Sequence, residues 1–230
     1  MKHSRAGRRR TAAAAAAVLV FVLALVFGAL SLRETAPDFA GDGLLRVCID
    51  AGHGGNDPGA TDPDGVRLEK DDCLAAALAV QAALAEAYPQ IEVLLTRSDD
   101  TFLELAERCA LANDFRADLF LSIHRNSAEG SAHGVEVWIP ADKPATDKRL
   151  AQDVLDGLRG VGISDDRGVK SGTAGNASGN YYVLGNTDMP GCLIELGFMT
   201  SAEDNALLDA HLGDYARAIA DAVAGLLLAD

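Results

Sequence analysis

The sequence predicts one α/β domain built in three layers, with a mainly parallel, twisted sheet of about six strands flanked by helices. Short apolar runs of strand length, beginning with Leu45–Ile49, alternate along the chain with longer segments whose apolar residues recur at helical spacing. The composition, 49% apolar and 23% charged, suits a globular domain, and the chain after its first segment is long enough for one core of about 200 residues. No internal repeat and no second domain is visible in the pattern.

The expected elements follow one another along the chain. Strands are expected at residues 45–49, 91–96, 118–123, 134–139, 181–184 and 191–194, and helices at residues 68–88, 101–112, 147–158 and 200–228. The pattern Thr101-x-x-Glu104 is a capping box, which predicts the start of the second helix. Residues 165–180 are too polar and too rich in glycine to carry core side chains, so an irregular segment is expected there.

The start of the chain differs in character from the rest. Five basic side chains precede an uncharged, mostly apolar run at residues 11–32; they are Lys2, Arg5, Arg8, Arg9 and Arg10. This order predicts export, and an apolar run of about 20 residues has the length of a membrane span. Residues 29–31 (Ala-Leu-Ser) would also serve as a cleavage site. We expect an N-terminal anchor at residues 1–32, or else a cleaved signal peptide, then a linker at 33–43 and the working domain at 44–230.

The working domain is strongly acidic. From Arg33 onward, 15 of the 20 Lys and Arg residues stand against all 34 Asp and Glu residues, a formal charge of −19. Binding of nucleic acid needs a basic surface, so the charge argues against nucleic acid as a partner. The charge also argues against attraction of the domain to anionic lipid head groups, and it favours a role in keeping an exported protein soluble.

Four cysteines lie within expected strands and helices, namely Cys48, Cys73, Cys109 and Cys192. An exported chain with four cysteines can form two disulfides. None of the four lies in a loop framework or in a Cys-x-x-Cys pair, however. We therefore expect buried free thiols that act as small apolar residues.

Three of the expected strands lead to residues with catalytic chemistry, His53, His124 and Glu195. Glycines surround His53, so that backbone and ligand can approach it closely. Glu69 lies in the first turn of a helix, where a carboxylate is also favoured by the helix N-terminus alone. Because ligands bind beyond the carboxyl ends of parallel strands, these four side chains are expected at one edge of the sheet. A lone histidine is more often structural, but this combination predicts a catalytic metal site.

Zinc is the metal that this residue set favours. Catalytic zinc commonly takes two His and one Glu and leaves a fourth position for water. The sequence offers His53, Glu69 and His124 as ligands of one Zn²⁺ per chain. Glu195 is then the general base and acid, which takes a proton from water and passes it to a leaving nitrogen. The wide sequence spacing excludes a zinc finger, and the lack of His-Glu-x-x-His excludes a thermolysin-type helix site.

Several stretches of the chain resemble a known family. In chain order, from about Arg46 to Leu228, they are IDAGHGGNDPGA, LEKD, LLTRSDD, LFLSIH with Asn126, GVEVW, NYYVL and MPGCLIELGFMT. Together they are similar to the zinc-dependent N-acetylmuramoyl-L-alanine amidases of the bacterial cell wall, the amidase-3 family. The resemblance implies the same ligand and catalytic roles that the residues themselves favour.

The reaction that the resemblance implies is hydrolysis of the amide between the lactyl group of N-acetylmuramic acid and the L-alanine of the stem peptide. Peptidoglycan is then the substrate, in cell-wall turnover or daughter-cell separation. Arg125 and Asn126, after the second histidine, are candidate substrate contacts. The family usually has a small residue where this chain has Arg125, whose guanidinium could bind a stem-peptide carboxylate or point to solvent. Only residues 140–146 separate an expected strand from the next helix, so the regulatory helix that plugs the site in some relatives is not expected.

Two other functions remain open for the same residues. The chain could be a zinc peptidase that cuts a peptide–peptide bond in peptidoglycan, or a non-catalytic wall-binding protein that retains the fold. The second is disfavoured because binding alone has no need of Glu195. Product analysis separates amidase from peptidase, since only an amidase releases a peptide with a free N-terminal L-alanine.

Overall fold

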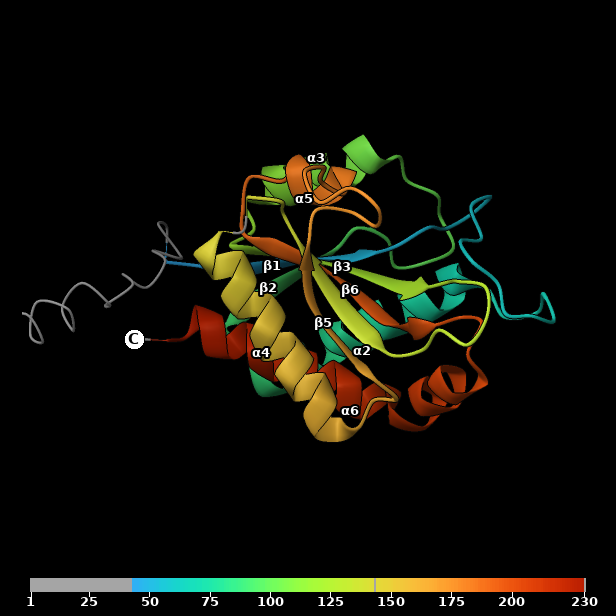
Figure 1. Ribbon diagram of the computed structural model, residues 1–230. Helices are drawn as coiled ribbons and strands as arrows, with labels where there is room; N and C mark the ends of the chain where they lie inside the picture. Colours follow the sequence, from blue (N-terminus) through green and yellow to red (C-terminus); the bar gives the residue numbers. More distant parts are fainter. Residues whose placement is uncertain (1–42, 143, 230) are drawn as a thin grey trace, which may run out of the picture. The chain divides into compact units, whose positions relative to one another are not determined.

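Six strands form the central sheet of the computed structural model, which describes residues 43–142 and 144–229 (Figure 1). They are β1 (Leu45–Ala51), β2 (Ile91–Leu95), β3 (Leu119–Asn126), β4 (Val135–Ile139), β5 (Asp166–Ser171) and β6 (Gly191–Phe198). Their order across the sheet is β2-β1-β3-β6-β4-β5. Neighbouring strands are parallel except for β4 and β6, which are antiparallel. The predicted mainly parallel sheet of about six strands is confirmed.

The direction of β4 brings a fourth strand to the edge where the site lies. β1, β3 and β6 run the same way, and the β3–β6 register pairs His124 with Glu195. Because β4 runs the opposite way, its first residues lie at this same edge, where Glu136 is paired with Glu195. Side chains from the ends of three strands and the start of a fourth therefore lie close together.

Helices cover both faces of the sheet. They are α2 (Glu69–Ala87), α3 (Leu105–Phe115), α4 (Ala145–Val161), α5 (Tyr182–Gly185) and α6 (Ala202–Leu227). α2, α4 and α6 pack on one face, and α3 and the short α5 lie on the other (Figure 1). The predicted three-layer architecture is confirmed.

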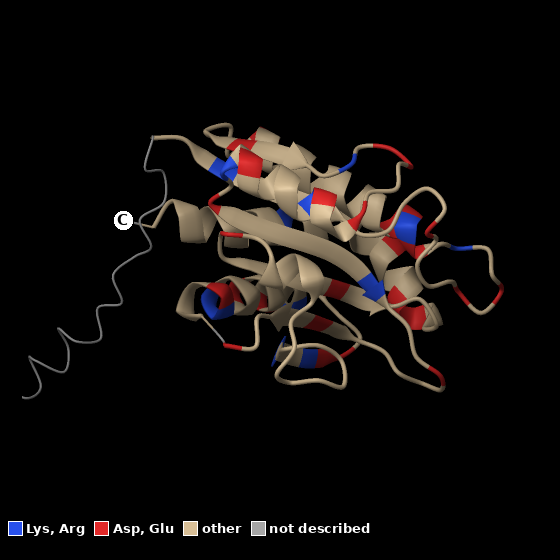
Figure 2. Cartoon of the chain, turned by 90° about the horizontal axis from the view of Figure 1, so that it is seen from above, with Lys and Arg blue, Asp and Glu red and all other residues tan. Residues whose placement is uncertain are grey.

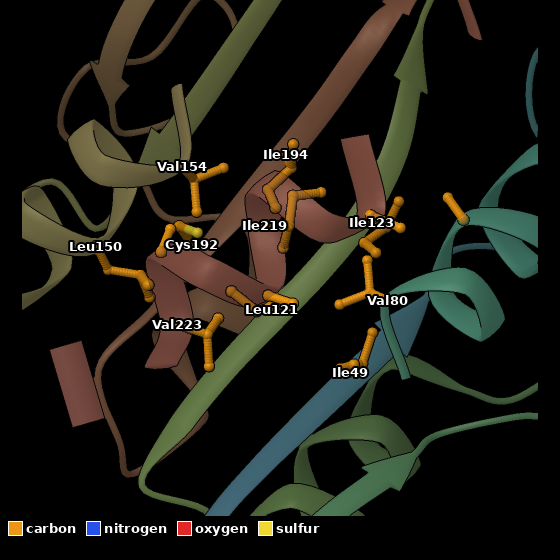
Figure 3. Close-up of a cluster of buried hydrophobic side chains, with 14 of the residues drawn as sticks. Ile49, Val80, Leu121, Ile123, Leu150, Val154, Cys192, Ile194, Ile219 and Val223 are labelled. Atoms are coloured by element: carbon orange, nitrogen blue, oxygen red, sulfur yellow. The ribbon is translucent and has the colours of Figure 1, made fainter. Parts of the chain in front are cut away.

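The larger hydrophobic core lies between the sheet and helices α2, α4 and α6. Leu121, Ile123 and Ile194 point into it from the strands, and Val80 and Ile219 point into it from the helices (Figure 3). Full burial of one such side chain contributes roughly 1.5–3 kcal/mol, so this layer is the main stabilising part of the fold. A smaller apolar cluster lies on the other face, beneath α3 and α5.

Two expectations about residues 165–185 are wrong. The strand expected at residues 181–184 is the short helix α5, and the segment expected to be irregular contains β5. β5 is an edge strand that pairs with β4 alone, and its side chains remain partly exposed, so it needs no apolar run. In α5, Val183 and Leu184 are buried in the smaller apolar cluster, and this packing overrides their preference for strand.

α3 begins later than expected. Its capping box is formed by Glu104 and Glu107, each of whose side chains accepts a hydrogen bond from the other's backbone N–H. Thr101 instead donates its hydroxyl proton to Asp99 Oδ1. The helix runs to Phe115, and Arg116, with a φ of +55°, ends it in the left-handed conformation.

All four cysteines are free and buried, as expected. Burial raises the pKa of Cys48, Cys73 and Cys192, which keeps their thiols protonated and unreactive. Within the residues that the structure describes, no helix combines the length and apolar character needed to cross a membrane. The anchor or signal peptide expected at residues 1–32 lies outside this part, as does the linker up to residue 42.

Candidate active site

His53 follows the end of β1 in a strained backbone conformation. Its φ is +58°, in the left-handed region that side-chain-bearing residues rarely adopt. Two buried arginines hold this turn, because Arg97 Nη2 donates to Gly52 O at 2.7 Å and Arg108 Nη2 donates to His53 O at 2.7 Å. Arg108 Nη1 also lies 2.9 Å from Oδ1 of the buried Asp50. These charge-assisted hydrogen bonds offset the strain and fix the direction of the His53 ring.

Two glycines make room for the side chains of the site. A Cβ at Gly52 would lie 2.3 Å from Cε1 of His124. A Cβ at Gly59 would lie 2.6 Å from Glu69 Oε2 and 2.7 Å from His53 Cδ2, and the φ of Gly59 is +65°. Both positions therefore need glycine on steric grounds.

The structure brings His53, Glu69 and His124 together. Glu69 Oε1 lies 3.0 Å from His53 Nε2 and 3.0 Å from His124 Nδ1. One ligand atom from each residue lies within 4.8 Å of the others, a spacing that could hold a single metal ion. The two imidazole rings stand nearly perpendicular, with centroids 4.9 Å apart, and each turns a nitrogen toward the Glu69 carboxylate.

A second set of hydrogen bonds orients these three side chains. Asp57 Oδ2 lies 2.8 Å from His53 Nδ1, which leaves Nε2 of His53 to face Glu69. The backbone N–H of Ala60 donates to Glu69 Oε2 at 2.8 Å, and that of Arg125 donates to Glu69 Oε1 at 3.0 Å. A carboxylate behind a histidine fixes its tautomer and ring orientation, as is usual for metal-binding histidines.

The pKa values of the cluster fit a cation site. Burial alone would lower the pKa of His53, but hydrogen bonds and charges from Glu69 and Asp57 raise it above its ordinary 6.5. Burial alone would raise the pKa of Glu69, but its contacts with His124 and His53 hold that pKa well below its ordinary value. The site therefore stabilises an ionised carboxylate next to positive charge.

Glu195 lies at the end of β6, next to His124 in the register of the sheet. Within the described residues, its Oε2 is the one buried side-chain oxygen without a hydrogen-bond partner. Burial raises the pKa of Glu195 to about 7; the positive charge of His124 opposes this rise, and the carboxylates of Glu69 and Glu136 add to it. A carboxylate that titrates near neutral pH and has a free oxygen is suited to accepting and returning a proton.

A cavity of about 400 Å³ opens beside these residues. Its polar lining includes His53, His124 and Glu195, together with Asp50, Asp57, Glu104 and Arg108. Its other walls come from the start of α3 and from α5, and they include Phe102, Leu103, Leu105, Tyr181, Tyr182 and Val183. An apolar lining with a few convergent polar groups is typical of clefts that bind organic ligands.

The structure contradicts both interpretations of Arg125 from the sequence, namely that it contacts substrate or that it points to solvent. The guanidinium is buried, forms an ion pair with Asp72 and donates to Asn205 Oδ1 at 2.7 Å. It also donates to the carbonyl oxygens of Gly197 and Phe198. Because side chains alternate along a strand, the residue after His124 faces α2 and α6 and not the cavity. Arg125 therefore ties these helices to β3 and β6.

Asn126 lies one position further and faces the same side of the sheet as His124. Its Nδ2 donates to Glu136 Oε1 at 2.9 Å, and its Oδ1 accepts from Ser127 N. Contact between Asn126 and substrate stays a prediction. Glu136 was not singled out in the sequence, although one acid inside the apolar strand GVEVWI is a detectable signal.

Other residues that build the site carry weaker sequence signals. Asp57 and Gly59 lie in a loop full of glycine, proline and aspartate, where turn chemistry explains them equally well. Arg97 and Arg108 resemble ordinary surface charges in the sequence. Their burial follows only from long-range contacts with the end of β1, which no local pattern reveals.

The chain matches a known family and its relatives. Residues 47–225 match Amidase_3, described as N-acetylmuramoyl-L-alanine amidase. The uncharacterized protein YqiI of Bacillus subtilis (strain 168) is 41% identical over 178 residues, which cover 77% of this chain and 80% of that protein. The sporulation-specific N-acetylmuramoyl-L-alanine amidase of the same strain is 35% identical over 161 residues, which cover 70% of this chain and 59% of the relative.

Solved structures of N-acetylmuramoyl-L-alanine amidases share the fold. The catalytic domain of CwlV from Bacillus (Paenibacillus) polymyxa var. colistinus aligns with a TM-score of 0.72 and 34% identity, over 81% of this chain and 100% of that domain. The enzyme from Clostridium difficile 630 aligns with a TM-score of 0.73 and 33% identity, over 81% of this chain and 98% of that one. On these matches, the chain belongs to the Amidase_3 family of N-acetylmuramoyl-L-alanine amidases.

Proposed function

We propose that this protein is a zinc-dependent hydrolase of peptidoglycan, which cleaves the amide between N-acetylmuramic acid and the L-alanine of the stem peptide. One observation carries the proposal: a His-Glu-His donor set lies beside Glu195, a buried carboxylate whose Oε2 has no partner in the described chain. Membership of the amidase family supports the choice of bond.

The donor set fits zinc. Two imidazole nitrogens and one carboxylate oxygen are the ligands that catalytic zinc commonly takes, whereas calcium and magnesium prefer oxygen alone. His53, Glu69 and His124 would hold the ion, and Asp57 would orient the first of them. Bound zinc lowers the pKa of a water to ~7 and polarises a carbonyl oxygen.

We assign to Glu195 the transfer of a proton from water to the leaving nitrogen. Glu195 lines the cavity beside His53 and His124, and its Oε2 has no competing hydrogen bond among the described residues, so it can take a proton from the attacking water. The same oxygen then returns the proton to the nitrogen of L-alanine as the amide breaks. The apolar walls from α3 and α5 keep bulk water away from the reacting groups, which strengthens these electrostatic interactions.

Product analysis on purified muropeptides tests the proposal against its two alternatives. We expect release of a peptide whose N-terminus is a free L-alanine, together with glycan that retains the lactyl carboxylate. Cleavage only at peptide–peptide bonds would identify a peptidase instead. Binding of peptidoglycan without any product from the zinc-loaded protein would identify a wall-binding protein.

The cell envelope is the proposed place of action. The basic and apolar segment at residues 1–32 supports export, with the segment as an anchor or as a cleaved signal peptide. Fractionation of the native host separates the two, because an anchored protein remains full-length in the membranes and a cleaved one is soluble and begins near Leu32. Only residues 140–144 lie between β4 and α4, which supports an active site without a plugging helix.

A further inference from the structure

A bulge in β5 places two basic side chains on one face of the sheet. In the β4–β5 register Val135 is paired with Asp166 and Val137 with Val169, so three steps along β5 match two along β4. Gly168, with a φ of +85°, takes up the extra residue. In a regular strand Arg167 and Lys170, three positions apart, would face opposite sides. A bulge re-aims side chains, and here both reach the same acid.

That acid is Glu136, whose carboxylate is buried among donors. Arg167 Nε donates to Glu136 Oε2 at 2.8 Å, and Lys170 Nζ lies 4.0 Å from the same oxygen. The other oxygen, Oε1, accepts from Asn126 Nδ2 at 2.9 Å and from Trp138 Nε1 at 3.0 Å. Glu136 therefore fixes both cations on this face, and both of its carboxylate oxygens already have partners.

The two cations lie on the same face of the sheet as the active site, and Arg167, next to the first residue of β5, also lies at the same edge. Glu136 is the register partner of Glu195, so their side chains share one face. β5 lies two strands from β6, and strands are spaced ~4.8 Å apart, which puts the backbone of Arg167 about 10 Å from that of Glu195. An extended peptide covers this distance in about three residues.

The cluster carries a surplus of positive charge in an acidic domain. One carboxylate, Glu136, faces two cations, whose side chains are 32% and 34% exposed for Arg167 and Lys170. The nearby Asp166 is paired with Arg159 at 3.1 Å. Residues 33–230 contain 34 Asp and Glu residues against 15 Lys and Arg residues, a formal charge of −19. Figure 2 shows acidic residues at many places on the domain. Partly exposed cations on this face therefore stand out as a binding feature for an anion.

We propose that Arg167 and Lys170 bind a carboxylate of the stem peptide, on the second or third residue of the peptide that leaves with the L-alanine. The inference rests on the proposed function and adds the direction in which the peptide lies, across β6, β4 and β5. Arg167 supplies a planar guanidinium for paired hydrogen bonds, and Lys170 supplies a second charge. The carboxylate-binding role that the sequence suggested for Arg125 is therefore assigned to Arg167 and Lys170 on β5.

The test uses two muramoyl tripeptides that differ only in whether the carboxylates of the second and third residues are free or amidated. Wild type should cleave the free acid with the higher kcat/KM. Lys170→Gln should lower kcat/KM for the acid about 5- to 10-fold and Arg167→Gln about 10- to 100-fold, mainly through KM, with little change for the amide. Lys148→Gln and Arg149→Gln, exposed changes on α4 with the same loss of charge, are the controls.

Equal losses on both tripeptides would show that the two cations act only by holding Glu136, and unchanged kinetics on the acid would also overturn the inference. A second measurement separates it from the proposed function. The released tripeptide, as acid and as amide, is titrated against the wild type and the four variants by calorimetry. If cleavage fails but Lys170→Gln and Arg167→Gln selectively weaken binding of the acid, the anion site stands and the proposed reaction does not. If cleavage occurs and all proteins bind the two tripeptides alike, the anion site is wrong and the reaction stands.

Discussion

The two faces of the sheet are built from the same strands but have different chemistry. On the face covered by α2, α4 and α6, the inward positions of the central strands are apolar, as at Ile49, Ile123 and Ile194. On the face toward α3 and α5, the neighbouring positions near the strand ends are polar, as at Asp50 and Glu195. Because side chains alternate along each strand, one step in sequence moves from the core to the site.

One face of the sheet therefore provides most of the stability, and the other carries the groups proposed to do the chemistry. The apolar face can hold the strands rigidly while the opposite face carries strain at His53, an unpartnered oxygen at Glu195 and buried arginines. Such features are costly in isolation, but Glu195 lies on a strand whose other side is anchored in the core, and His53, Arg97 and Arg108 are tied to the end of another such strand, β1. Mutations on the two faces should therefore have separable effects.

The largest expected effect comes from removing the ligands. The double variant His53→Ala, His124→Ala should lose stoichiometric zinc and all activity, because two of three ligands are gone. Metal analysis after dialysis measures this, and unfolding curves in chelator should show that the fold persists. His211→Ala, on α6 and outside the cluster, is the control. Retention of one zinc per chain by the double variant would remove this site from consideration.

On the core face, Ile194→Ala should act on stability alone. Ile194 is fully buried, so the cavity left behind should cost about 2–5 kcal/mol in the free energy of unfolding. Zinc affinity of the folded protein should change little, although Glu195 is the next residue. Denaturant titrations of the metal-free protein measure the first quantity. A cost below about 1 kcal/mol, or a large loss of zinc affinity, would break the separation of the two faces.

The metal-free protein should become less stable as pH rises, because Glu195 on the face toward α3 and α5 must lose its proton. The pKa of Glu195 is raised from 4.5 to about 7 by burial, so the folded chain holds a proton that the unfolded chain has released. Between these values the free energy of unfolding should fall with pH, by roughly 3 kcal/mol in total. Glu195→Gln should lack this loss, while the contribution of His53 is common to both proteins. Parallel unfolding curves for the two proteins from pH 4 to 8 would contradict the assignment.

A smaller effect on zinc affinity is expected from Asp57, which contacts the proposed ligand His53. Asp57 accepts from Gly59 N with one oxygen and contacts His53 Nδ1 with the other. Asp57→Asn has a single oxygen and cannot keep both contacts, so zinc affinity should fall about 10- to 100-fold. Competition with a chromophoric chelator measures the affinity, and Asp64→Asn, an exposed change in the same loop, is the control. Equal affinities for the two variants would show that Asp57 does not orient His53.

The sequence was sufficient to predict those features of the fold and site that depend on local sequence patterns. Periodicity located most strands and helices, and the positions of His53, His124 and Glu195 at strand ends predicted that they would meet. Fold class, family and the grouping of the candidate metal ligands could therefore be predicted.

The remaining features depend on contacts that sequence patterns do not record. A bulge and an edge position concealed β5, and packing of Val183 turned an expected strand into α5. The direction of Arg125 follows from strand alternation, yet its burial depends on Asp72 and Asn205, more than 50 residues away in either direction. Long-range partners, and not local propensity, decided these cases.

The most direct test of the account measures zinc content and turnover on the same sample of Glu195→Gln. The substitution keeps the shape of the side chain but removes the basic oxygen that has no other partner. We predict one zinc per chain and a kcat lowered about 10²- to 10⁴-fold, the usual contribution of general acid–base catalysis. Loss of the zinc would make Glu195 a ligand, and near-normal turnover with zinc bound would mean that another group moves the proton; either result would contradict the account.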